Sequence, residues 1–320
     1  MLECKNKDDV NLTVLTRPTL MSVFYSPKIK MDRDHLHWLP VFFILLQNTL
    51  YGFGDPISKA AYEVLPVFSL LSVRYSIALA FLLLVFGKRI LRGLRACSWR
   101  DWIVPSLCMG GAYVCGNIAL EMTAATSVAF IRSLSTVMTP LLALAMFRKR
   151  ISRRQILILL MTVVGLYLLC GMGGLSGFGM GEVLALFTSL LISGALIFGE
   201  RSMKRVDSIT LTAVQIAASV AFALVCALVF EHGIHMKAAT GIHWIVIIYL
   251  ALACTIAGYL LQNMALGRIS ARVVALLQCI CPVMTALFSW LMLGETLSVA
   301  GLIGAAILVI CVAAETMMTD

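Results

Sequence analysis

Ionisable side chains occur inside long apolar stretches of this sequence, where a charge is unusual. Asp55 and Lys59 lie one helical turn apart, and Arg74 and Arg132 each lie within a later apolar stretch. Charged side chains at such positions are costly in a membrane and usually line a pathway or pair with each other. Since Arg binds a carboxylate through two parallel hydrogen bonds, a cavity with this surplus of positive charge would attract a solute with an acidic group.

Each of these side chains also has a structural interpretation. Asp55 and Lys59 can form a closed pair, Lys59 at a helix end can extend its amine towards the interface, and the arginines can donate to backbone carbonyls. Gly52, Gly54 and Pro56 surround Asp55. They can interrupt a helix where it lines a cavity, or they can mark a packing kink. The sequence leaves both interpretations open.

Neutral polar residues form a second group of candidates. Tyr113 and Asn117 are one turn apart, as are Tyr259 and Asn263, so that each pair presents one helix face. Interhelical hydrogen bonds are the alternative explanation for these pairs. The complete set of candidate substrate-binding residues is Asp55, Lys59, Arg74, Tyr75, Tyr113, Asn117, Arg132, Gln215, Tyr259, Asn263 and Gln278.

Motifs for catalysis or metal binding do not fit their surroundings. Gly174-Leu175-Ser176-Gly177 has the GxSG form of an intramembrane serine protease, but it lies in a predicted loop, and no His lies well inside an apolar stretch to act as its base. There is neither an HExxH zinc motif nor a phosphate-binding GxxxxGK(S/T) loop. The ten cysteines form no CxxC pair. We therefore expect no enzyme, cofactor or metal site, and no ATP-driven pump in this chain alone.

The elements that carry these residues are predicted to be membrane-spanning helices. The chain of 320 residues is 61% apolar and 13% charged, with a mean hydropathy of +0.96, which is far more apolar than a soluble domain. One crossing needs about 20 apolar residues, and a backbone in lipid must satisfy its own hydrogen bonds, so such stretches are helices. The predicted spans are 39–60, 66–86, 102–121, 125–147, 155–174, 181–200, 208–230, 243–265, 271–293 and 297–316.

The positive charge predicts orientation in the membrane and does not predict nucleic-acid binding. The net charge of +9 falls in clusters between the apolar stretches, chiefly at 88–100, 148–154, 201–205 and 268–272. Positive loops stay cytoplasmic. We therefore expect an integral protein of the plasma (inner) membrane, surrounded by lipid, with both termini in the cytoplasm. Residues 1–37 are polar without an apolar core, so we expect a cytoplasmic tail and no cleaved signal peptide, and Met31 is an alternative start.

An internal repeat relates the two halves of the chain. A single ungapped offset of 146 residues aligns 108–152 with 254–298, and under it Arg132 corresponds to Gln278. A looser offset of 141 aligns Arg74 with Gln215. Equivalent positions are separated by an odd number of spans, so the halves are expected to be inverted, which is a transporter architecture with the substrate site between the halves. The clearest matches are Tyr113 with Tyr259, Asn117 with Asn263, and Val137-Met138-Thr139 with Val283-Met284-Thr285.

Short motifs add a family resemblance over about residues 38–316. Tyr51-Gly52 followed by Lys59, Arg74-Tyr75 in the second span, and Pro282 followed by Gly294-Glu295 and Gly301 resemble the EamA-type family of the drug/metabolite transporter superfamily. In the first half Thr136 and Lys149 replace the family's Pro and Glu. The resemblance implies ten helices in two inverted five-helix repeats and the transport of amino acids, metabolites or drugs.

The combined expectation is an all-α membrane protein of ten transmembrane helices in two inverted five-helix repeats, 38–175 and 176–320. Its expected function is secondary or facilitative transport, as an exporter, of a small polar metabolite, amino acid or drug by alternating access. An acidic or zwitterionic solute is expected from the charged residues. The alternatives are a non-transporting membrane sensor or partner protein and, with less support, an intramembrane enzyme.

Overall fold

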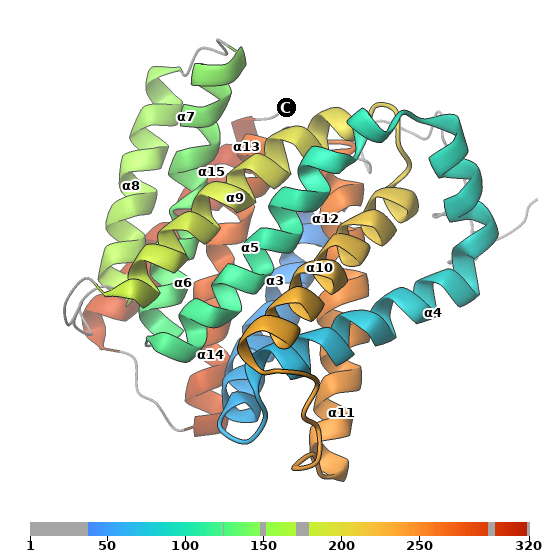
Figure 1. Ribbon diagram of the computed structural model, residues 1–320. Helices are drawn as coiled ribbons and strands as arrows, with labels where there is room; N and C mark the ends of the chain where they lie inside the picture. Colours follow the sequence, from blue (N-terminus) through green and yellow to red (C-terminus); the bar gives the residue numbers. More distant parts are fainter. Residues whose placement is uncertain (1–37, 124, 148–151, 171–178, 294–297, 319–320) are drawn as a thin grey trace, which may run out of the picture. The chain divides into compact units, whose positions relative to one another are not determined.

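The computed structural model describes residues 38–318 apart from 124, 148–151, 171–178 and 294–297. The predicted tail 1–37, the boundary between the predicted repeats and Gly294-Glu295 lie outside these residues. All regular elements described are helical (Figure 1). In chain order they are α3 (Trp38–Tyr62), α4 (Val67–Ala96), η1 (Trp99–Asp101), α5 (Ile103–Met122), α6 (Ala125–Ser133), α7 (Ser135–Phe147), α8 (Arg153–Cys170), α9 (Met180–Ser202), α10 (Ser208–Phe230), α11 (Gly241–Tyr249), η3 (Leu250–Ala257), α12 (Gly258–Leu266), α13 (Ala271–Leu277), η4 (Gln278–Ile280), α14 (Cys281–Leu293) and α15 (Val299–Met318).

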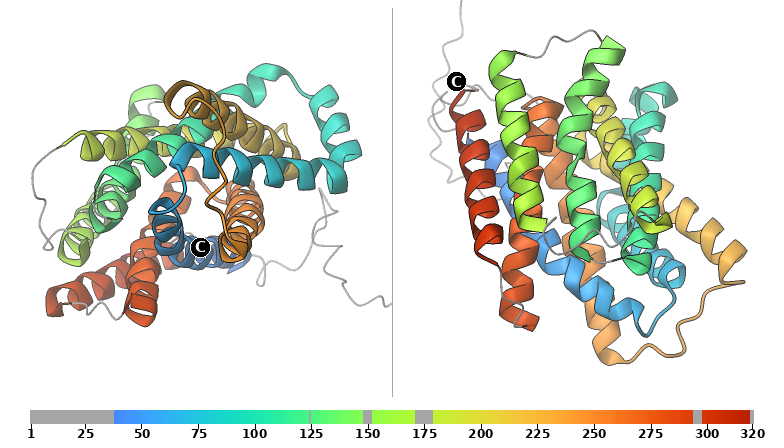
Figure 2. Two further views of the ribbon diagram at one scale, coloured as in Figure 1. Left: turned by 60° about the horizontal axis from the view of Figure 1, so that its bottom comes forward. Right: turned by 90° about the vertical axis from the view of Figure 1, so that its left-hand side faces the viewer.

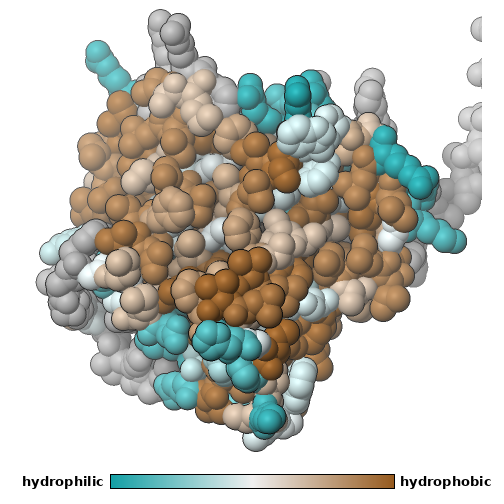
Figure 3. Space-filling view, viewed as in Figure 1, coloured by the Kyte–Doolittle hydropathy of each residue, from teal (hydrophilic) through white to brown (hydrophobic). Residues whose placement is uncertain are grey.

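The helices have the length and surface of membrane spans. Among the described residues, 6 helical segments are long and apolar enough to cross a bilayer, and two shorter apolar helices accompany them. Large apolar side chains point outward, such as Leu84 at 86% exposure and Ile245 at 69%. Figure 3 shows apolar residues across most of one face, with hydrophilic residues gathered at its upper and lower rims. In water such a surface would aggregate, whereas in lipid it is the solvent-facing surface.

Close helix packing depends on small residues at the contacts. α4 packs against α10, α5 against α9, α3 against α12 and α14, and α8 lies beside α15 (Figure 2). A Cβ added at Gly52 of α3 would lie 2.5 Å from Cβ of Met284 on α14, and one at Gly54 would lie 2.6 Å from Sγ of Cys254. α3 remains one helix from Trp38 to Tyr62 with Pro56 inside it. These glycines therefore permit close approach between helices and do not interrupt α3.

Helix boundaries follow the same offset as the sequence repeat. α6 and α7 are separated at Leu134, and the 3₁₀ turn η4 ends at Ile280, which is 146 residues later. α7 begins at Ser135 and α14 at Cys281, so these two helices also start 146 residues apart and both contain 13 residues. Both predicted spans, 125–147 and 271–293, are thus broken near their middle, at equivalent places.

Two further spans differ from the sequence prediction. α4 continues to Ala96, ten residues beyond the predicted end at 86, because Lys, Arg and Leu are good helix formers outside lipid as well. The predicted span 243–265 contains a π-helical segment, η3, between α11 and α12. Hydropathy detects how apolar a segment is, but it does not detect a change in the hydrogen-bonding pattern of its backbone.

Candidate functional site

A cavity lies among the helices that carry the predicted charges. Its volume is about 80 Å³. Helices from both halves of the chain line it, including α3, α4, α5 and α6 from the first half and η3, α12 and α14 from the second. Its lining residues that carry polar groups or thiols are Asn48, Tyr51, Asp55, Ser58, Arg74, Tyr113, Asn117, Arg132, Ser133, Ser135, Thr136, Thr188, Cys254, Gln262, Gln278 and Cys281.

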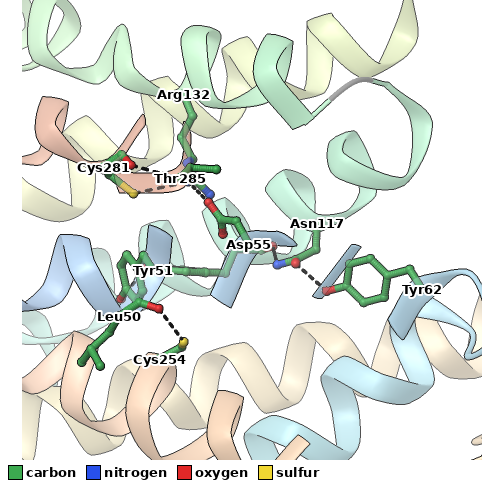
Figure 4. A network of polar contacts seen from close by, with 10 residues as sticks. Leu50, Tyr51, Asp55, Tyr62, Asn117, Arg132, Cys254, Cys281 and Thr285 are labelled. Carbon is green, nitrogen blue, oxygen red and sulfur yellow. Dashed lines mark hydrogen bonds and ion pairs between the residues drawn. The ribbon is translucent and has the colours of Figure 1, made fainter. Parts of the chain in front are cut away.

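Asp55 and Arg132 form an ion pair across this cavity (Figure 4). Nη2 of Arg132 lies 2.6 Å from Oδ2 of Asp55, and both side chains are about a quarter exposed, at 25% and 23%. The same nitrogen lies 4.0 Å from Sγ of Cys281 on α14. The predicted alternative of a closed Asp55–Lys59 pair is therefore wrong, because a guanidinium from α6 reaches the carboxylate instead. Lys59 does not line the cavity.

Arg74 is the second guanidinium of the cavity, and no carboxylate in the described part of the chain pairs with it. The residue is only 4% exposed. Its Nε donates to Oγ1 of Thr255 at 2.9 Å, and its guanidinium lies 5.4 Å from the ring centroid of Tyr75. Among the described residues no carboxylate lies within 4.0 Å of it. A buried charge without a counter-charge is costly, so the guanidinium of Arg74 can bind an anionic group that enters the cavity.

The backbone around Arg74 is held in place at both ends of its helix. The carboxylate of Glu231, after α10, accepts hydrogen bonds from the backbone N–H of Phe68 and Ser69, both at 2.8 Å. A carboxylate at a helix N-terminus is favourable because it meets unpaired N–H groups and the positive end of the helix dipole. Towards the other end of α4, Arg89 lies 3.2 Å from Asp207 at the start of α10. These contacts thus fix the position of α4, which carries Arg74, against α10 and the residue that follows it.

The π-helical segment supplies the acceptor for Arg74. Thr255 lies within η3, where its Oγ1 also donates to the carbonyl of Leu250, five residues earlier, at 3.0 Å. π-helical turns in otherwise regular helices occur frequently at functional sites. Leu250 and Cys254 of the same segment line the cavity. This irregularity was not predicted, because the sequence 250–257 is uniformly apolar except for Thr255.

Tyrosines form one wall of the cavity. The hydroxyl of Tyr113 donates to the hydroxyl of Tyr51 at 2.7 Å, and the rings of Tyr113 and Tyr259 lie 4.9 Å apart between centroids. The hydroxyl of Tyr62 donates to Oδ1 of Asn117 at 2.5 Å (Figure 4). Of these residues Tyr51, Tyr113 and Asn117 line the cavity, whereas Tyr259 is fully buried behind them.

Side-chain amides form a second polar group in the cavity wall. Nε2 of Gln278 donates to Oε1 of Gln262 at 2.8 Å, and Nε2 of Gln47 donates to the same oxygen at 3.1 Å. Asn48 donates to the carbonyl of Leu277 at 2.7 Å. Gln278 corresponds to Arg132 under the offset of 146 residues, so the second half carries an amide where the first half carries a guanidinium. Asn48 and Gln262 were absent from the sequence candidates, although a polar amide inside an apolar span was the signal that could have found them.

Several sequence candidates lie outside the cavity. Tyr75, Gln215, Tyr259 and Asn263 are fully buried and do not line it. Nδ2 of Asn263 donates to Oε1 of Gln215 at 2.7 Å and to Oγ1 of Thr212 at 2.9 Å. These bonds join α12 to α10, so the interhelical explanation applies to Asn263 and Gln215. The helix face of Asn263 was predicted from spacing alone, and spacing does not indicate which neighbour a face packs against.

Comparison with known proteins gives the family. The EamA-like transporter family matches the chain twice, over residues 38–171 and 179–314. The chain belongs to the EamA-like transporter family. It is therefore an integral membrane protein with two EamA repeats, in a family of the drug/metabolite transporter superfamily that is generally not enzymatic.

One curated protein and one solved structure are similar to this chain. An uncharacterized transporter of Archaeoglobus fulgidus is 26% identical over 153 residues, which cover 48% of this chain and 46% of the relative. The match thus spans about half the length of that relative. One protein of known crystal structure superimposes with a TM-score of 0.72 at 19% identity, covering 90% of this chain and 98% of the other. At that identity the similarity supports the fold alone.

Proposed function

We propose that this EamA transporter is a secondary or facilitative exporter of a small polar solute with an acidic group, including the zwitterionic amino acids. Ten transmembrane helices form two inverted repeats, 38–175 and 176–320, which alternate access to the central cavity. Both termini are cytoplasmic in a plasma (inner) membrane. The offset of 146 residues shared by the sequence repeat and the helix breaks supports this arrangement.

The observation that carries the proposal is the buried guanidinium of Arg74. It lines the cavity and is 4% exposed, and among the described residues its side-chain hydrogen-bond acceptor is the neutral hydroxyl of Thr255 alone. A solute carboxylate would supply the missing negative charge and accept two parallel hydrogen bonds. Within this interpretation the Asp55–Arg132 pair and the hydroxyls of Tyr51 and Tyr113 contact the remainder of the solute.

The size of the cavity supports a small solute. The cavity has a volume of about 80 Å³, and a cavity of about 10–15 Å³ is enough to hold one water molecule. A solute with the dimensions of a short hydroxy acid or amino acid fits this space, whereas a large drug requires the helices to move apart.

Flux measurements in proteoliposomes test the proposal. The purified protein is reconstituted, and counterflow is measured for a panel of labelled organic acids and amino acids. We expect saturable flux that Arg74→Gln reduces by roughly 10- to 100-fold, since a hydrogen bond to a charged group contributes about 1.5–3 kcal/mol. Arg92→Gln is the matched control, because Arg92 lies on the same helix and bonds only to the carbonyl of Lys88. Absence of saturable flux across the panel, or equal flux in both variants, contradicts the proposal.

A further inference from the structure

The charges on the cavity wall do not cancel. Three ionisable side chains from the described residues line the cavity with a formal charge: Asp55, Arg74 and Arg132. Arginine remains protonated in proteins, and Asp55 forms an ion pair with Arg132 at 2.6 Å. The pair contributes no net charge, so the cavity wall carries one positive charge, located at Arg74.

Charged residues at the ends of α3 and α5 do not line the cavity, so they do not enter this sum. Lys59, Glu63 and Glu121 lie at the ends of α3 and α5, and none of them lines the cavity. The sequence predicted a surplus of two positive charges because it counted Lys59 with the other cations. The structure reduces that surplus to one.

We infer that the transported solute carries one net negative charge, as a small monocarboxylate does. This inference rests on the proposed function and narrows its substrate class. A monoanion bound at Arg74 leaves a neutral occupied cavity, which is the least costly state to enclose in a low-dielectric membrane.

Zwitterions and dianions fit this charge distribution less well. The ammonium of a zwitterion needs a carboxylate, and Asp55 already pairs with Arg132; occupancy would also leave the positive charge of the cavity uncancelled. A dianion would bring one negative charge too many, because the second guanidinium is neutralised by Asp55. Each case encloses an unbalanced charge away from water.

Charge variants of the ion pair provide a test that does not depend on the identity of the natural solute. Three probes of similar size differ in charge at pH 7.5: lactate as a monoanion, L-alanine as a zwitterion and malonate as a dianion. Counterflow of each is measured in proteoliposomes with the wild-type protein, Asp55→Asn, and the double variant Asp55→Asn/Arg132→Gln. Asp55→Asn raises the cavity charge to two positive charges, and the double variant returns it to one.

The expected result is a change of preference and its reversal. Wild-type protein should transport lactate at least about tenfold faster than L-alanine or malonate, because only lactate leaves no uncompensated charge in the occupied cavity; tenfold corresponds to about 1.4 kcal/mol. Asp55→Asn should favour malonate over lactate, and the double variant should favour lactate again. Saturable flux of malonate in Asp55→Asn shows that this single variant is folded.

The outcomes separate this inference from the proposed function. Flux of L-alanine above lactate, with dependence on Arg74, overturns the monoanion inference and leaves the transport proposal standing. An unchanged order of preference in Asp55→Asn overturns the inference in the same way. Absence of flux for all three probes and for the wider panel overturns the transport proposal itself.

Discussion

Substitution of Gly52 by Ala should destabilise the contact between the two halves of the transporter. A Cβ at this position would lie 2.5 Å from Cβ of Met284, 2.8 Å from its backbone carbon and 2.9 Å from the backbone nitrogen of Thr285. Two of these three atoms belong to the backbone of α14, so no side-chain rotation relieves the clash. An ordinary carbon–carbon contact is about 3.5–4.0 Å, so α3 and α14 must separate by roughly 1 Å.

The cost of that separation can be estimated. Overpacking of a tight contact usually costs about 1–3 kcal/mol, and replacement of Gly by Ala within a helix returns about 0.5–1 kcal/mol. The net loss is therefore roughly 0–2.5 kcal/mol in the free energy of unfolding. Since Asp55 lies one turn beyond Gly52 and Cys281 lies one turn before Met284, flux should fall with stability.

Thermal unfolding in detergent measures the effect, and Gly87→Ala is its control. A Cβ at Gly87 of α4 would have no neighbour within 4 Å, so that variant should unfold at the wild-type temperature or slightly above it. Gly52→Ala should unfold at a lower temperature and transport more slowly. If the two variants unfold at the same temperature, the close approach of α3 to α14 is refuted.

Two further predictions concern residues away from the cavity. Asn263→Leu should lower the free energy of unfolding by about 1–3 kcal/mol, because it leaves the buried Gln215 carboxamide without its partner. The affinity for transported solutes should not change. A tenfold loss of affinity at unchanged stability would contradict this. Burial, together with Asp101 and Asp207, raises the pKa of the Cys97 thiol after α4, so an impermeant maleimide should label it slowly at pH 7 and faster at pH 9, with Cys97→Ser as the control. Labelling should occur only from the cytoplasmic side, and labelling from outside would reverse the proposed orientation.

The helical architecture could be predicted because it depends on local composition. Lipid requires each backbone to satisfy its own hydrogen bonds, so the length of an apolar stretch determines where a helix begins and ends. α3, α5 and α10 match their predicted spans to within two residues. Among the described residues, six segments are long and apolar enough to cross a membrane. The full set of ten spans and their orientation stay predictions.

The site was predictable only in part, because pairing depends on contacts between distant segments. Charges inside apolar stretches were visible in the sequence, and the structure brings Asp55, Arg74 and Arg132 to one cavity. Their pairing was not predictable, since the carboxylate meets Arg132, 77 residues away, and not Lys59, one turn away. The break in α6–α7 and the π-helical turn around Thr255 were also invisible, because apolar sequences of similar hydropathy adopt either backbone form.

The central claim is that Arg74 binds the anionic group of the solute, and equilibrium binding tests it most directly. Binding of radiolabelled lactate to detergent-purified protein requires neither sealed vesicles nor a known orientation. We expect Arg74→Gln to weaken lactate binding at least about tenfold, a loss of about 1.4 kcal/mol, and Arg92→Gln on the same helix to retain wild-type affinity. Equal lactate affinity in wild-type protein and Arg74→Gln would contradict it.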